Sequence, residues 1–140
     1  MVLHTSRLSA VLPLFRYSAT AVAVGRVGLG VAALVSPSVP ARPWVGSSAD
    51  ELGAQVFGRA LGARDLALGL GALTAVRGTS ARSRPVGAWY AAGALSDALD
   101  VAVTLATWRR LPRATRWLVA ASAGGAAVAG AAGTVAAFLE

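Results

Sequence analysis

The stretch GRALGARDLALGLG, residues 58–71, combines a membrane-like composition with charged side chains. Apart from Arg59, Arg64 and Asp65 it contains only Leu, Ala and Gly. A charge at the centre of a membrane helix costs about 2.5–3.5 kcal/mol on insertion scales, whereas a Leu returns only about 0.3–0.6 kcal/mol. The stretch therefore predicts a helix whose charges are buried against partners elsewhere in the chain.

The composition of the whole chain favours a membrane protein of one domain. Its 140 residues are 56% hydrophobic and only 14% charged, against roughly 25% charged residues in a typical soluble domain. The net charge of +7 comes from arginines scattered beside apolar segments, which indicates contact with anionic lipid headgroups and argues against nucleic acid. There is no Cys and the only His is His4, so we expect neither a metal site nor a cofactor.

Apolar segments of helical length divide the chain into four expected membrane spans. Each has close to the roughly 20 residues that cross a bilayer; they cover residues 18–36, 53–76, 87–107 and 117–139. The four tryptophans fall at the ends of these segments, where an amphipathic ring favours the membrane interface; they are Trp44, Trp89, Trp108 and Trp117. We expect an all-α transmembrane four-helix bundle with short loops, forming a single membrane domain over 1–140, multi-pass in the cell membrane.

Two other readings of the apolar segments are open. A soluble helical bundle is disfavoured by the uncharged fourth segment. A cleaved signal peptide is suggested by the start of the chain and by Ser38–Ala41, but Arg26 interrupts its apolar core. The orientation is undetermined, because the two sides of the expected topology carry five arginines each: Arg7, Arg16, Arg77, Arg82 and Arg84 against Arg42, Arg109, Arg110, Arg113 and Arg116.

Six charges lie within the expected spans, three positive and three negative, namely Arg26, Arg59, Arg64, Asp65, Asp97 and Asp100. They form the candidate site, because six uncompensated charges would cost roughly 15–21 kcal/mol, more than a small bundle tolerates. We expect them to pair in the bundle interior. Arg suits this role because its planar fork makes paired hydrogen bonds to a carboxylate.

Helical periodicity predicts which helix faces carry these charges. One face of the second span holds Gly58, Gly62, Asp65 and Gly69, a pattern that favours close helix packing. A polar stripe of the third span holds Tyr90, Gly93, Asp97, Asp100 and Thr104, with Tyr90 and Thr104 as supporting polar groups. We expect Arg64 and Arg59 to reach Asp97 and Asp100, and Arg26 to reach Asp65.

The fourth span is expected to pack through small residues. Ala or Gly recurs at every fourth position, at Ala121, Gly125, Ala129, Gly133 and Ala137. Such a ridge allows close backbone approach, although an Ala-rich composition also produces it by chance.

Three motifs resemble a family of small bacterial membrane proteins of about four helices, known only as a domain of unknown function. They are ARPWVG (41–46), FGRALGARDLALG (57–69) and WYAAGALSDALD (89–100). Together they cover roughly residues 42–103 and contain Arg, then Gly-x-Arg-Asp with a following Leu-Gly, then Asp-x-x-Asp. The resemblance implies an integral membrane protein with a polar core. It implies no substrate, cofactor or reaction.

Three functions are compatible with the charge pattern. The first is an accessory or structural membrane protein whose Arg–Asp network fixes helix register and partner choice, with a homo-oligomer or another membrane protein as partner. The second is a proton-coupled carrier acting as an oligomer, with Asp97 or Asp100 holding the proton. The third is a membrane enzyme acting on a lipid-like substrate, with Asp97 or Asp100 as acid or base and Tyr90 as donor. We expect the first and no enzymatic activity.

Overall fold

The computed structural model describes residues 3–77 and 84–139, with side chains placed for 12–77 and 85–139. These ranges contain helices and turns and no β-strand, which confirms the expected all-α class. The helices are α1 (Leu3–Val35), α2 (Ser38–Val45), the 3₁₀ helix η1 (Gly46–Asp50), α3 (Leu52–Arg77), α4 (Arg84–Ala106) and α5 (Arg116–Leu139). The side chains of His4, Arg7, Arg82 and Arg84 lie outside the described part.

The described chain has four long helices, where the four spans were expected. It also has one short α-helix, α2, which the expected four-helix bundle does not include. The first helix ends at Val35, directly before the proline-rich segment, but it begins far ahead of Ser18. Pro40 lies in the first turn of α2, where its missing N–H would have no partner in any case, so it does not stop that helix. Gly46 ends α2 with a φ of 68°, which a residue with a Cβ adopts only under strain.

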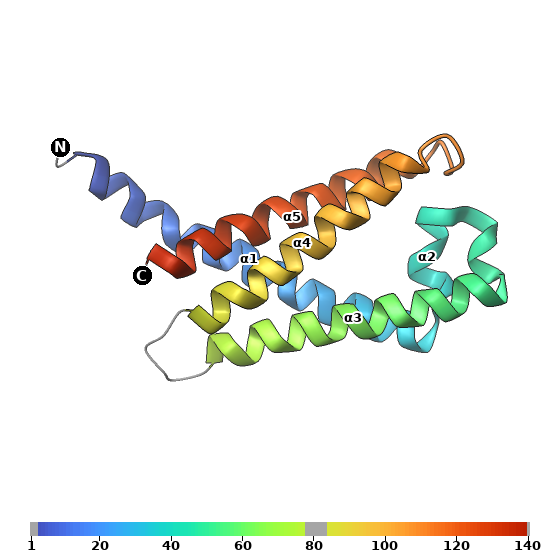
Figure 1. The fold of residues 1–140 in the computed structure, drawn as a ribbon, viewed down its shortest axis with the longest axis horizontal. Helices are drawn as coiled ribbons and strands as arrows, with labels where there is room; N and C mark the ends of the chain where they lie inside the picture. Colours follow the sequence, from blue (N-terminus) through green and yellow to red (C-terminus); the bar gives the residue numbers. More distant parts are fainter. Residues whose placement is uncertain (1–2, 78–83, 140) are drawn as a thin grey trace.

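The four long helices form a bundle in which consecutive helices run antiparallel (Figure 1). The main contacts are between α1 and α3 and between α4 and α5; α1 also packs on α5, and α3 on α4. α2 and η1 lie at the end of the bundle away from both chain termini (Figure 1). Gly46 meets the α4–α5 connection there, since a Cβ on it would lie 3.2 Å from Pro112.

Helices α1 and α3 approach so closely that their contact residues need to be small. A Cβ on Gly30 would lie 2.7 Å from the carbonyl oxygen of Gly62, and one on Gly62 would lie 2.7 Å from the Cβ of Ala33. A Cβ on Gly69 would lie 2.7 Å from the carbonyl oxygen of Ala23. The glycine face of α3 therefore packs on α1, which brings Asp65, on that same face, to the inner side of α1.

The four-residue ridge of α5 packs only at its C-terminal end. Gly133 and Ala137 are buried, whereas Ala121 and Gly125 are exposed and no atom lies within 4 Å of a Cβ built on Gly125. A spacing of four exceeds the 3.6 residues of a helical turn, so the row drifts around the helix and away from the contact. The buried residues of α5 are instead spaced three, three and one positions apart: Gly130, Gly133, Ala136 and Ala137.

Two of the four tryptophans meet at the α4–α5 connection. The rings of Trp108 and Trp117 pack edge to face with centroids 4.6 Å apart. The Arg116 guanidinium lies 4.8 Å from the centre of the Trp108 ring, a cation–π distance. These contacts hold the start of α5 against the end of α4.

Candidate functional site

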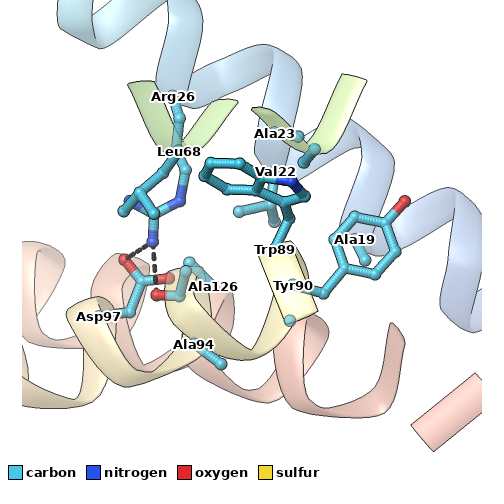
Figure 2. Close-up of a pocket in the computed structure, with 13 residues that line it drawn as sticks. Ala19, Val22, Ala23, Arg26, Leu68, Trp89, Tyr90, Ala94, Asp97 and Ala126 are labelled. Atoms are coloured by element: carbon cyan, nitrogen blue, oxygen red, sulfur yellow. Dashed lines mark hydrogen bonds and ion pairs between the residues drawn. The ribbon is translucent and has the colours of Figure 1, made fainter. Parts of the chain in front are cut away.

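Arg26 lies at the centre of the bundle and joins three helices. Its Nη1 donates to Asp65 Oδ1 on α3 at 2.6 Å. Its Nη2 donates to the Gly93 carbonyl oxygen on α4 at 2.7 Å and lies 2.6 Å from Asp97 Oδ1. Figure 2 shows the side chain extending from α1 to Asp97. Because Arg26 is only 7% exposed, these are charge-assisted bonds shielded from water.

A second arginine joins α3 to α4 beside the first. Arg64 donates through Nη2 to Asp100 Oδ2 at 2.9 Å and through Nη1 to Asp100 Oδ1 at 3.2 Å, the two-pronged geometry that favours arginine. Its Nη2 also lies 3.3 Å from Asp65 Oδ1. Asp65 therefore accepts from both arginines and connects the two pairs into one network, which we call the charge cluster: Arg26, Arg64, Asp65, Asp97 and Asp100.

Small residues on both sides make room for the central guanidinium. A Cβ on Gly93 would lie 3.4 Å from Arg26 Nε, so the guanidinium rests directly on the α4 backbone. The close α1–α3 packing at Gly62 and Gly69 brings Asp65 within reach of Arg26. The cluster thus depends on backbone approach as much as on the charges themselves.

The sixth expected member of the site, Arg59, does not join the cluster. It is exposed, and it forms no ion pair or hydrogen bond with the side chains that the structure describes. Arg59 precedes Arg64 by five residues, which places it about 140° farther round α3. Without it, the cluster contains two arginines and three aspartates, a formal charge of −1.

Asp97 is the member whose hydrogen bonds are least complete. The residue is 8% exposed, and its Oδ1 pairs with Arg26. Its Oδ2 is buried and accepts no hydrogen bond from any described residue. Buried carboxylate oxygens are normally paired, so the Oδ2 of Asp97 is available to a further donor.

The two supporting polar residues make hydrogen bonds that do not involve the charged side chains. The Oη of Tyr90, which is 4% exposed, lies 2.7 Å from Thr20 Oγ1 on α1. Thr104 is fully buried and donates to the backbone carbonyl of Asp100 at 2.6 Å. Tyr90 thus ties α4 to α1 one turn before Gly93, and Thr104 caps a carbonyl within α4.

A cavity of about 410 Å³ opens onto the charge cluster between α1, α2 and α5. We call it the interhelical cavity. Its polar wall consists of Arg26, Asp65, Asp97 and Asp100. Its other walls are mainly apolar and include Val22, Leu29, Pro40, Pro43, Trp44, Leu118 and Val119. A smaller cavity of about 150 Å³, also lined by Trp44, lies on the Arg64 side of the cluster.

The described residues contain no group of three or more His, Asp or Glu side chains arranged to hold a metal ion. The three aspartates are occupied by arginines on at least one oxygen each. The arrangement is therefore that of an ion-pair network beside a cavity.

Sequence periodicity indicated the Arg26–Asp65 and Arg64–Asp100 contacts but assigned Asp97 to the arginines of α3. Asp97 instead pairs with Arg26, and the Gly93 carbonyl joins the site as an acceptor. The position of Gly93, four residues before Asp97 on the same helix face, is the sequence signal for this role. Nothing in the sequence indicated the interhelical cavity.

Neither a family model nor a curated protein nor a solved structure matches this chain.

Proposed function

We propose that the protein is a multi-pass integral membrane protein of the cell membrane with an accessory or structural role, in which the charge cluster fixes the arrangement of the helices. One observation carries the membrane part of the proposal: the polarity of the bundle is inverted. The charge cluster lies inside, while large apolar side chains lie outside on every long helix, among them Val24 (56% exposed), Phe57 (73%), Leu99 (57%) and Val128 (71%).

The interior supports the same proposal. Apart from Val86 and Tyr90, the buried hydrophobic residues in the described part of the chain are all alanines. Water drives the largest apolar side chains into the core of a soluble bundle, and an exposed apolar surface of this extent is a liability there. In a bilayer, helices associate through small residues and buried polar contacts.

Among the residues that the structure describes, two helices meet the length and composition of a membrane span: Leu12–Val35 within α1, and α5. In the most apolar part of each helix only 28% and 11% of the residues are buried, so most of these positions are at least partly exposed. Such helices also occur in soluble cores and in signal sequences, but core helices are mostly buried. Helices α3 and α4 carry charges, and their inward pairing lowers the cost of placing them in the bilayer.

The accessory role rests on the contacts that the two arginines of the charge cluster make between helices. Arg26 connects α1, α3 and α4, and Arg64 connects α3 and α4. A buried network of this kind fixes helix register, since any slip breaks several charge-assisted bonds at once. The partners that fit are anionic lipid headgroups and a second membrane protein or copy of this chain.

Alkaline carbonate extraction of cell membranes tests the membrane proposal. We expect the protein to stay in the pellet and to float with lipid in a density gradient. Release into the supernatant would overturn the proposal.

A substitution on the outer face sharpens this test. Val128→Lys on α5 places a charge where lipid is expected, at a cost of about 2.5–3.5 kcal/mol near the bilayer centre. We expect poor membrane insertion of Val128→Lys, and normal insertion of the apolar control Val128→Leu. A soluble bundle would tolerate both substitutions equally.

A proton-coupled carrier is the second candidate, favoured by the interhelical cavity and by the unpaired Oδ2 of Asp97. It predicts proton-dependent flux in proteoliposomes that Asp97→Asn abolishes. Equal flux in the two proteins would exclude it. An enzyme is less favoured, because Tyr90 does not line the interhelical cavity and its hydroxyl is bonded to Thr20.

A further inference from the structure

The interhelical cavity has one charged wall and several apolar walls. We propose that it binds an amphipathic organic cation, that is, a molecule with a single ammonium group on an apolar body. The ammonium would face Asp97, and the apolar body would lie against α1, α2 and α5. This inference goes beyond the accessory role and requires only the fold described above.

The charge of the cluster favours a cation. Two arginines face three aspartates, so one negative charge has no counterpart among the described side chains. The other charged groups nearby are already paired or turned away: Arg42 bonds to Asp50, and Arg59 is exposed. A monovalent cation restores neutrality in a site of low polarity, where an unbalanced charge is expensive.

Asp97 provides the contact point for the ammonium group. It lines the interhelical cavity, it is 8% exposed, and its Oδ2 has no donor among the described residues. An ammonium group at this wall would bind the Asp97 carboxylate with a charge-assisted hydrogen bond, once the carboxylate turns its buried Oδ2 toward the ligand. The Oδ1 of the same carboxylate stays with Arg26.

The arginines offer little to an anion. Both terminal nitrogens of Arg26 are engaged by Asp65, Gly93 and Asp97. The Nε of Arg64 has no hydrogen-bond partner among the described residues, but Arg64 lines the smaller cavity and not the interhelical cavity. A carboxylate ligand would therefore meet the aspartates without gaining an arginine.

The remaining walls fit an apolar body. A volume of about 410 Å³ lies within the range of sites for small organic molecules, roughly 300–1,000 Å³. Val22, Leu29 and Val119 supply aliphatic surface, and Trp44 of α2 adds an indole ring that attracts both apolar groups and cations. A bare metal ion would leave these walls unused.

Isothermal titration with three ligands of matched shape tests the inference: 4-phenylbutylamine, 4-phenylbutanol and 4-phenylbutanoate. The full-length protein is used in lipid nanodiscs, or in buffer if carbonate releases it from membranes, so that failure of the membrane proposal does not affect this test. We expect the amine to bind at least about tenfold more tightly than the alcohol, and the carboxylate to bind least. Equal affinity for the three, or no binding of the amine, would overturn the inference.

Substitutions on α5 separate the cavity from the apolar outer surface. Ser122 lines the interhelical cavity and takes no part in the charge cluster, so Ser122→Phe fills the cavity and should weaken amine binding at least about tenfold. Val128→Phe on the outer face of the same helix is the matched control and should bind as wild type does. Unchanged amine binding in Ser122→Phe would contradict the proposed site. Asp97→Asn should abolish the preference for the amine over the alcohol, and retention of that preference would contradict the role of Asp97.

Discussion

Arg26 of α1 rests on the backbone of Gly93 of α4: its Nη2 donates to the Gly93 carbonyl oxygen at 2.7 Å, and a Cβ at position 93 would lie 3.4 Å from its Nε. The contact crosses the centre of the bundle, where the hydrogen bond between Thr20 and Tyr90 also joins α1 to α4. The same guanidinium also binds Asp65 and Asp97. One side chain therefore joins α1, α3 and α4.

The size of the side chain at position 93 should determine whether the Arg26 guanidinium keeps its contacts with the Gly93 carbonyl and Asp97. Gly93→Ala adds a methyl group at ordinary contact distance and should leave stability nearly unchanged. Gly93→Leu should displace the guanidinium and leave the buried Asp97 without a cation, at a cost of about 3–5 kcal/mol. Thermal unfolding followed by circular dichroism in detergent micelles measures both. Equal melting temperatures for the two variants would contradict the contact.

The three arginines of the expected site should differ in their effect on stability. Arg26→Gln leaves the buried Asp97 without a cation and removes one of the two cations that Asp65 contacts, so it should cost about 3–5 kcal/mol. Arg64→Gln should cost less, because its side chain is 32% exposed and water can replace part of the interaction. Arg59→Gln is the matched control, with no expected change, since Arg59 is exposed and outside the cluster. The same ranking should appear in the yield of folded protein, and an effect of Arg59→Gln equal to that of Arg26→Gln would argue against the observed network.

Two glycines, Gly62 at the α1–α3 contact and Gly28 outside it, should respond oppositely to substitution by alanine. Gly62→Ala would place a Cβ 2.7 Å from that of Ala33 and 3.0 Å from the Gly30 carbonyl oxygen, so α1 and α3 need to separate, at about 1–3 kcal/mol. Gly28→Ala meets no atom within 4 Å and should be neutral or stabilise by up to about 1 kcal/mol through helix propensity. Melting temperatures of the two variants check this contrast. A stabilising Gly62→Ala would show that the helices are farther apart than described.

Tyr90 should act through its hydrogen bond to Thr20 and not through chemistry. Tyr90→Phe removes the 2.7 Å contact between the two hydroxyls and should cost about 0.5–1.5 kcal/mol. Thr20 retains its bond to the Arg16 carbonyl oxygen, so no group on α1 is left without a partner. Binding of 4-phenylbutylamine should be unchanged in this variant. Loss of binding would instead place the tyrosine hydroxyl in the ligand site.

The residues that share a face of one helix could be predicted from the sequence. Gly62, Asp65 and Gly69 align on α3 because the helical repeat is a local property, and the structure places all three against α1. The need to pair and bury the charges could also be predicted from the sequence, since an unpaired charge in an apolar helix is costly wherever that helix packs. The all-α class and the buried Arg–Asp cluster follow from these two arguments and are confirmed.

The sequence did not indicate in the same way which charged residues of different helices would pair. Arg26 takes Asp97 as well as Asp65, and Arg59 is left outside, because these contacts depend on how the helices cross. The helix α2 and the interhelical cavity arise where α1 and α5 diverge and the proline-rich connection folds over them. The four long helices, their polar faces and the need for charge pairing follow from the sequence alone, since all three depend on local periodicity and solvation. The place of Asp97 beside Arg26, the exclusion of Arg59 and the position of the cavity follow from the folded chain, because crossing angles and backbone approach result from packing over the whole chain.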